Sequence, residues 1–182
     1  MKNYQPAIKY GVYLGLIGVL IHLITYAIDA KLFLSTGYGL FSGVLVGLAA
    51  PIVFMILGAR DSKVNFGNFN FGKAFASALL VGVVATLISL GYTLLFNGVI
   101  DTELADWMYE QKMDEQIEKM EAMNYDEATI EKSMNMAAKT KPYTTGALGA
   151  LIVHGVFLFW YLILALIIGA VQKDKQQKDL IA

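Results

Sequence analysis

The sequence contains no cysteine and few charged residues. Asp, Glu, Lys and Arg make up 16% of its 182 residues, whereas soluble proteins average about 25%. The missing cysteines exclude a disulfide-stapled secreted domain. The balance of 14 basic against 15 acidic residues excludes a nucleic-acid binder with a basic face. A hydrophobic fraction of 57% and a mean hydropathy of +0.55 argue against a disordered chain and a soluble enzyme, and leave a small membrane protein.

The sequence also lacks the motifs of common enzyme and metal sites. It has no Gly-x-Ser-x-Gly, no His-Glu-x-x-His, no P-loop and no calcium-binding loop. His22 and His154 are its only histidines, and no third and fourth metal ligand accompanies them. We therefore expect no catalytic residue, no metal and no cofactor. An integral membrane enzyme that acts on lipid is the least supported hypothesis.

Four long apolar stretches predict membrane-spanning helices. A bilayer core of about 30 Å requires roughly 20 apolar residues in a helix. The stretches that meet this requirement are residues 8–28, 38–57, 74–96 and 146–171. Because backbone amides in lipid must be satisfied within their own segment, we expect helices rather than strands. The predicted fold class is an all-α integral membrane protein, with residues 1–182 forming a single four-helix membrane domain.

The distribution of Lys and Arg predicts the orientation of these helices, since cytoplasmic loops carry an excess of both near the span ends. Eight basic residues flank the spans on one side: Lys2, Lys9, Arg60, Lys63, Lys73, Lys173, Lys175 and Lys178. On the other side lie Lys31 and residues 101–141, whose 11 acidic and five basic residues sum to a net charge of −6. We therefore expect both termini in the cytoplasm and residues 101–141 in the periplasm.

The acidic residues 101–141 contain two amphipathic patterns. The first, over about residues 102–123, aligns four residues on one face: Tyr109, Met113, Ile117 and Met120. The second follows Asp126, a residue type favoured at helix N-caps, and aligns Ile130, Met134 and Ala137. The patterns predict a helical hairpin that needs further support, because so few apolar side chains barely offset the ordering of about 40 residues. Three interpretations stay open: a cap on the protein's own bundle, a surface for a partner or second copy, and partial disorder.

Glycines recur at the spacing of closely packed membrane helices. Each of the first two spans carries three of them: Gly11, Gly15 and Gly18, then Gly39, Gly43 and Gly47. Small residues let helix backbones approach one another where lipid removes the hydrophobic driving force. The pattern predicts tight helix packing, with packing inside one chain favoured over packing between chains.

Polar residues inside the spans form a second candidate site. His22, Tyr26 and Asp29 recur at i, i+4 and i+7, which places them on one face of the first helix. His154 in the fourth span falls at a similar predicted depth in the outer half of the membrane. Intramembrane ionisable groups are costly and often functional, so these residues predict a proton or cation path. The competing interpretation is a neutral imidazole that is hydrogen-bonded between helices.

Several sequence features also follow one another in a recognisable order. A basic N-terminus and a Gly-rich first span precede FNFGKAF at residues 69–75, just before the third span. Then come Asp101, a Met- and Glu-rich stretch that includes YDEATIEKSM at residues 125–134, and Pro142. This order resembles the uncharacterised Bacteroidota membrane family known as domain of unknown function 4199, although Thr102 stands where many relatives have Pro. The resemblance implies four spans and an inner-membrane location, but no activity or ligand.

These features lead to two hypotheses of function. The first is an accessory, assembly or interaction subunit of an inner-membrane complex, whose periplasmic hairpin binds its partner through Tyr109, Met113, Ile117, Met120, Ile130 and Met134. The alternative is a small oligomeric transporter or channel that uses His22, Tyr26, Asp29 and His154. The expected partners are the lipid bilayer and another membrane or periplasmic protein or a second copy of the chain, without nucleic acid.

Overall fold

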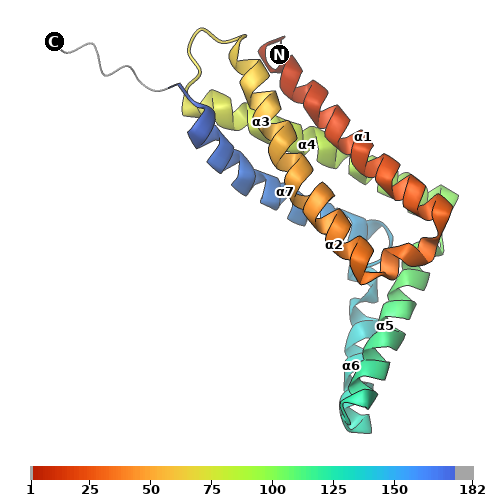
Figure 1. Ribbon diagram of the computed structural model, residues 1–182. Helices are drawn as coiled ribbons and strands as arrows, with labels where there is room; N and C mark the ends of the chain where they lie inside the picture. The colour runs from red at the N-terminus through yellow and green to blue at the C-terminus, as the bar shows by residue number, and fades with distance from the viewer. Residues whose placement is uncertain (1, 175–182) are drawn as a thin grey trace. The chain divides into compact units, whose positions relative to one another are not determined.

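The computed structural model describes residues 2–174, and within this range it contains helices and loops but no β-strand (Figure 1). The α-helices are α1 (Gln5–Ile28), α2 (Thr36–Val44), α3 (Ala50–Lys63), α4 (Phe71–Leu95), α5 (Leu104–Ala122), α6 (Glu127–Thr140) and α7 (Gly146–Gln172). The shorter segments are the 3-10 helices η1 (Lys2–Tyr4), η2 (Ala30–Leu34) and η5 (Lys141–Tyr143), and the π-helical turns η3 (Leu45–Ala49) and η4 (Phe96–Ile100). Met1, the C-terminus and the predicted cytoplasmic residues Lys175 and Lys178 lie outside the described residues.

Four continuous helical stretches are long and apolar enough to cross a membrane: Lys2–Ile28, Thr36–Lys63, Phe71–Ile100 and Gly146–Gln172. The prediction of an all-helical chain with four such helices is confirmed, and it indicates a multi-pass membrane protein. Each helix runs past its predicted apolar stretch at one or both ends. Polar residues such as Arg60 and Lys63 continue the helix without belonging to the apolar run.

The described chain divides into two compact units, and α1, α2, α4 and α7 contribute residues to both. Among the described residues, the first unit comprises 2–20, Phe41–Ser89 and 157–174, and the second comprises Ile21–Leu40 and Leu90–Val156. The first unit holds the main core. Its buried members come from α1, α3, α4 and α7 and include Leu14, Met55, Val81, Tyr161 and Leu164.

Close helix approaches in the first unit occur at glycines, and α4 takes part in most of them. A Cβ atom at Gly11 of α1 would lie 2.8 Å from the Val81 carbonyl oxygen of α4. One at Gly82 of α4 would lie 2.7 Å from Tyr161 Cβ of α7. Similar conflicts would arise at Gly15, Gly58 and Gly169. Helix packing in this unit therefore depends on the missing side chains of these glycines.

The glycines of the second predicted ladder have different surroundings. A Cβ atom at Gly39 or Gly43 would meet no heavy atom of the described chain within 4 Å, and one at Gly47 would meet only the Ser42 carbonyl of its own helix. A Cβ atom added at Gly18, in the first ladder, would lie at an ordinary contact distance of 3.8 Å from Val46 Cγ1. Gly11 and Gly15 thus serve packing within the chain, whereas a Cβ atom added at Gly39, Gly43 or Gly47 would meet no neighbouring helix among the described residues.

The second membrane-length helix is interrupted at Pro51, and α7 compensates for the interruption. Proline has no N–H group, so the carbonyl of Gly47, four residues earlier, loses its usual α-helical donor. The π-helical turn η3 lies directly before α3 at this point. The indole Nε1–H of Trp160 on α7 donates to the Gly47 oxygen at 3.1 Å. The interruption thereby creates a polar contact between two helices of the first unit.

The loop before α4 is connected to the end of α7 within the first unit. Asn70 caps α4, because its Oδ1 accepts the Lys73 N–H at 3.1 Å. Phe69 is fully buried, and its N–H donates to Asp174 Oδ2 at 2.8 Å, while the Asp174 N–H donates back to the Phe69 carbonyl at 2.8 Å. Lys63 Nζ lies 2.7 Å from Asp174 Oδ1. The Lys63 ammonium and the Phe69 N–H both lower the pKa of Asp174.

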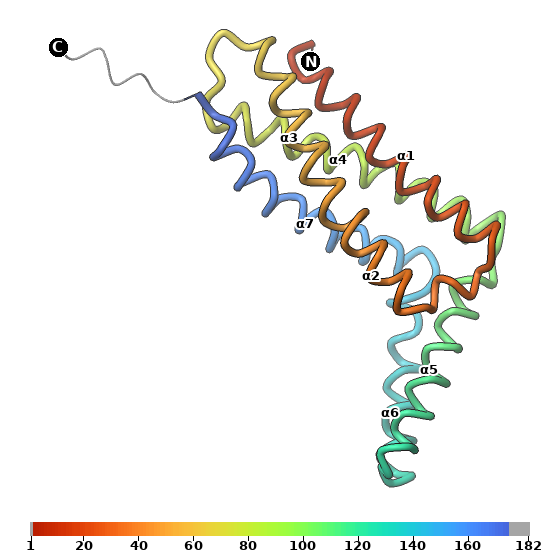
Figure 2. Tube along the Cα trace, in the orientation of Figure 1, coloured from red at the N-terminus to blue at the C-terminus, as the bar shows by residue number. Residues whose placement is uncertain are grey.

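In the second unit, α5 and α6 lie side by side as a hairpin (Figures 1 and 2). Asn124 makes the corner with a φ of 58°, and the Asp126 carboxylate caps α6 by accepting the Thr129 N–H at 2.8 Å. The Tyr109 hydroxyl donates to the Ala137 carbonyl at 2.6 Å. Lys141 Nζ lies 3.1 Å from Glu110 Oε1 on α5. The hairpin predicted for residues 101–141 is present, closed by these contacts.

Candidate functional site

His22, one of the four predicted polar residues, lies among aromatic rings in the second unit. Its Nδ1 is 2.8 Å from the Tyr92 hydroxyl oxygen of α4. Its ring stacks on Phe33 at 4.7 Å between centroids, and Phe96 meets it edge-on at 5.0 Å. A small cavity of about 130 Å³, lined also by Asn97, adjoins this group. The imidazole is therefore held by one interhelical hydrogen bond and by ring packing.

Tyr26 lies one turn further along α1, and its partner is Asp101 at the end of the third membrane-length helix. The Tyr26 hydroxyl donates to Asp101 Oδ2 at 2.8 Å. Asp101 Oδ1 accepts the N–H groups of Leu104 at 2.9 Å and Glu103 at 3.2 Å, so it also caps the start of α5. The Tyr26 O–H, more than these two backbone N–H groups, lowers the pKa of Asp101. One carboxylate thus connects α1 to the base of the hairpin.

Asp29 and His154 do not take part in these contacts. Asp29 Oδ1 accepts the Lys31 N–H at 2.8 Å and caps η2. His154 Nδ1 lies 2.8 Å from the Ala150 carbonyl of its own helix. His22 and Tyr26 are the two predicted residues that share a neighbour, because both rings pack against Phe96 at 5.0 Å between centroids.

The partners Tyr92 and Asp101 lie 70 and 75 residues from His22 and Tyr26 in the sequence. Helical periodicity within one segment does not relate residues so far apart. The one sequence feature that could have indicated a role for Asp101 was its position as a carboxylate at the end of the third span. For Tyr92, in an uncharged span that also carries other aromatic residues, the sequence offered none.

The base of the hairpin also borders an open pocket of about 630 Å³, which has carboxylates and aromatic rings on its walls. Its polar and aromatic lining includes Tyr26, Asp29, Lys31, Asp101, Glu103 and Trp107. Within residues 2–174, no group of three or more His, Cys, Asp or Glu side chains is arranged to hold a metal ion. Two of its carboxylates have structural roles, because Asp29 caps η2 and Asp101 caps the start of α5 and accepts the Tyr26 hydroxyl.

The predicted partner surface is largely used inside the hairpin. Tyr109, Met113, Ile117, Met120 and Ile130 are half-buried. Met134 is exposed instead, because α6 turns Ile130, Ser133 and Ala137 inward. The stripe of residues 109–120 is therefore half-buried, and Tyr109 within it bonds to α6.

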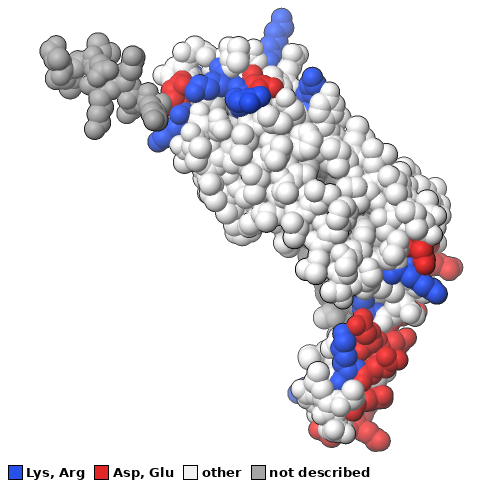
Figure 3. Space-filling view, viewed as in Figure 1, with Lys and Arg blue, Asp and Glu red and all other residues white. Residues whose placement is uncertain are grey.

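The outer surface of the hairpin carries other apolar residues among many carboxylates. Its large exposed apolar side chains are Met123 (67% exposed), Tyr125 (50%), Met134 (48%) and Met136 (58%). The acidic side chains gather along α5 (Figure 3). Apolar side chains surrounded by charge are typical of surfaces that bind other proteins.

Comparison with known proteins identifies the family of the chain. The sequence model of the family described as "Protein of unknown function (DUF4199)" matches residues 9–174. The chain belongs to this family. No curated protein and no solved structure matches it.

The DUF4199 match includes the whole hairpin. Residues 9–174 run from within α1 to just past the end of α7, so α5 and α6 lie inside the matched region. Asp101, which joins the hairpin to α1, lies inside it as well. The hairpin therefore lies inside the matched region and not beyond either end of it.

Proposed function

We propose that this DUF4199 protein is an interaction subunit of a bacterial inner-membrane complex, and that the hairpin α5–α6 is its docking element. The observation that carries this proposal is the distribution of apolar residues on the hairpin. The stripe that includes Met113 and Ile117 is half-buried, while Met123, Tyr125, Met134 and Met136 are exposed. A hairpin that is closed by its own contacts still offers apolar side chains to a second surface.

The charge of the hairpin indicates the chemistry of that surface. Residues 101–141 carry a net charge of −6, and most of the acids lie on α5. Complementary charge accelerates the encounter of two proteins, while buried apolar and aromatic anchors supply most of the affinity. The partner should therefore be a protein with a basic surface and apolar depressions for Met and Tyr side chains.

We also propose that both termini lie in the cytoplasm and that the hairpin lies in the periplasm. The basic residues of the first unit gather at the end that holds the N-terminus (Figure 3). Single cysteines at Glu118 and at Asn65 test this orientation against a background without cysteine. Glu118→Cys should react with an impermeant maleimide in intact spheroplasts, and Asn65→Cys only after lysis. The opposite pattern would overturn the proposed orientation.

The docking proposal is tested by purifying the tagged protein in mild detergent from its native membrane. Stoichiometric partners are identified by mass spectrometry, and the complex is then washed at about 1 M salt, where the Debye length is about 3 Å. A variant with Met123, Tyr125, Met134 and Met136 changed to Ser should lose the partner. High salt should weaken the complex formed by the unchanged protein.

A matched control removes exposed apolar side chains elsewhere. Val64 is 86% exposed and Tyr143 is 57% exposed, and neither lies on α5 or α6. The variant V64S/Y143S should keep the partner. The proposal fails if the hairpin variant retains the partner, or if the unchanged protein purifies as a homo-oligomer without any foreign subunit.

A second candidate function is a small oligomeric transporter or channel. The observation that favours it is the pair of hydrogen bonds, His22 to Tyr92 and Tyr26 to Asp101, because the His22 and Tyr26 rings both pack against Phe96. Reconstituted protein would be assayed for proton or cation flux across liposomes. His22→Ala should abolish the flux if this candidate is right, and the absence of flux from the unchanged protein would exclude it.

A further inference from the structure

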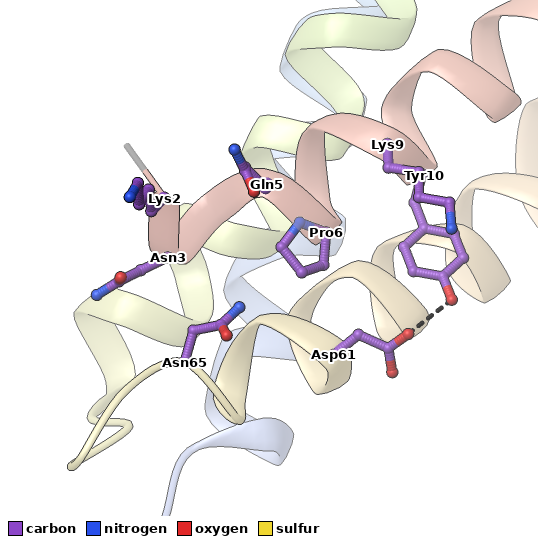
Figure 4. Close-up of a pocket in the computed structure, with 8 residues that line it drawn as sticks. All are labelled: Lys2, Asn3, Gln5, Pro6, Lys9, Tyr10, Asp61 and Asn65. Carbon is purple, nitrogen blue, oxygen red and sulfur yellow. Dashed lines mark hydrogen bonds between the residues drawn. The ribbon is translucent and has the colours of Figure 1, made fainter.

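An open pocket of about 590 Å³, lined mainly by polar residues, lies in the first unit between the start of α1 and the end of α3 (Figure 4). Its volume falls in the range of small-molecule sites. The residues that give it its chemistry are Lys2, Asn3, Lys9, Tyr10, Asp61 and Asn65. Two lysines and one carboxylate thus line the same pocket, together with amide side chains.

The carboxylate of Asp61 is held in a defined position. The Tyr10 hydroxyl donates to its Oδ2 at 2.7 Å, and Figure 4 shows the two side chains pointing toward one another. Arg60 Nε lies 3.3 Å from its Oδ1. The Asp61 side chain is still 37% exposed. A carboxylate oriented in this way can accept further hydrogen bonds from a ligand.

Neither lysine of the pocket is paired with a carboxylate. The salt bridges of the described residues involve Arg60, Lys63, Lys119 and Lys141, but not Lys2 or Lys9. Lys9 Nζ lies 5.6 Å from the centroid of the Tyr13 ring. The flexible four-carbon stems let both ammonium groups turn toward an anion in the pocket.

The position of the pocket indicates where its ligand comes from. The first membrane-length helix begins at Lys2 and the second ends at Lys63, so the pocket lies where both helices leave the apolar region. Lipid headgroups lie at this level of a bilayer. Basic pockets between membrane helices bind phosphate-bearing headgroups.

We propose that this pocket binds a phosphoethanolamine headgroup, with the phosphate on Lys2 and Lys9 and the primary ammonium on Asp61. A purely anionic headgroup offers no N–H to the Asp61 carboxylate, whose existing partners are the Tyr10 hydroxyl and Arg60. A choline headgroup has no N–H to donate to that carboxylate, whereas a primary ammonium donates up to three charge-assisted hydrogen bonds. The pocket thus provides one partner for each charge of the zwitterion.

The test measures lipid binding by native mass spectrometry of the purified full-length protein. The probes are phosphatidylethanolamine, phosphatidylcholine and phosphatidylglycerol with identical acyl chains, and free phosphoethanolamine. We expect the ethanolamine lipid to bind about tenfold more tightly than the choline lipid, as a charge-assisted hydrogen bond implies. Binding of free phosphoethanolamine alone, without the lipid, would assign the pocket to a soluble ligand and overturn the lipid proposal.

Two substitutions separate the charges of the pocket. Asp61→Asn keeps an oxygen that can accept the Tyr10 hydroxyl, but it removes the negative charge. It should abolish the preference for ethanolamine over choline and leave or increase binding of the glycerol lipid. Lys2→Gln with Lys9→Gln should weaken binding of all three lipids. Circular dichroism of each variant checks that the helices remain folded.

Matched controls change the same residue types outside the pocket. Asp174 pairs with Lys63, and Lys73 Nζ donates to the Asn68 carbonyl, both in the first unit. Asp174→Asn and Lys73→Gln should leave the order of lipid affinities unchanged. Equal affinity of the unchanged protein for all three lipids, or an unchanged ethanolamine preference in Asp61→Asn, would overturn the proposal.

Discussion

Replacing Trp160 with Phe tests how the break in the second membrane-length helix is stabilised. The substitution keeps an aromatic ring on α7 but removes the N–H that donates to the Gly47 carbonyl at 3.1 Å. Pro51 has no N–H to take its place. The Gly47 oxygen is then left without the indole donor in an apolar environment, where an unsatisfied carbonyl is costly.

The expected magnitude follows from hydrogen bonds between membrane helices, which contribute about 0.6 kcal/mol on average and at most about 1.7 kcal/mol. Trp160→Phe should lower the free energy of unfolding by about 1–3 kcal/mol, because indole packing is lost as well. Pro51→Ala restores an N–H four residues after Gly47. In that background the same Trp160 substitution should cost about 0.6–1.7 kcal/mol less, because the Gly47 carbonyl keeps a backbone donor.

The four proteins of this double-mutant cycle would be unfolded reversibly in mixed micelles of lipid and SDS. Trp107 serves as the control, because it is the only other tryptophan and makes no indole hydrogen bond in the described structure. Trp107→Phe should cost the same with Pro or Ala at position 51. The explanation is refuted if the cost of Trp160→Phe is equal in both backgrounds within about 0.3 kcal/mol, since independent sites add within about that error.

Three further predictions concern other parts of the chain. Gly82→Leu should lower the free energy of unfolding, measured in the same SDS titration, by about 3 kcal/mol or more. Gly43→Leu should change it by less than about 0.5 kcal/mol, because an added Cβ is obstructed only at Gly82. Contacts in the folded protein lower the pKa of Asp101 from its ordinary 3.8. The stabilisation that the Asp101 carboxylate provides is therefore complete above pH 3.8, and it is lost as the pH falls through the lower pKa of the folded state. The protection of the first turn of α5 against hydrogen exchange, measured relative to the intrinsic exchange rate at each pH, should therefore fall in acid, and Asp101→Asn should remove this acid-dependent step. Asp126→Ala should reduce the helicity measured by circular dichroism, because it removes the N-cap of α6, while Glu127→Ala should not.

The helical architecture could be predicted from the sequence because its causes are local. A bilayer requires about 20 apolar residues, and each of the four stretches provides them with few charges. Asp126 is a favourable N-cap in any context, and the spacing of Tyr109, Met113 and Ile117 is that of one helix face. These properties depend on neighbours within a few residues in the sequence.

Contacts between distant segments could not be predicted in the same way. Asp29 and Asp101 are both carboxylates at the end of a span, and nothing within α1 indicates that Tyr26 bonds the distant one. The glycine ladders were equally ambiguous, since Gly11 and Gly43 occur in similar apolar helices. Only the position of α4 makes Gly11 a close contact, and that position is a property of the folded chain.

Asp101 shows why a contact between distant segments can matter more for docking than the periodic apolar pattern of the hairpin. Its carboxylate accepts the Tyr26 hydroxyl and two N–H groups of the first turn of α5, so the start of the hairpin and the end of α1 share one acceptor. If the hairpin docks a partner, a change in its tilt would strain this contact. Asp101→Asn retains one acceptor oxygen, but its NH₂ group cannot accept the hydrogen bonds that the second carboxylate oxygen accepts. The variant Asp101→Asn leaves the outer residues of the hairpin unchanged. If this variant binds the partner less tightly, docking depends on the orientation of the hairpin and not only on its surface.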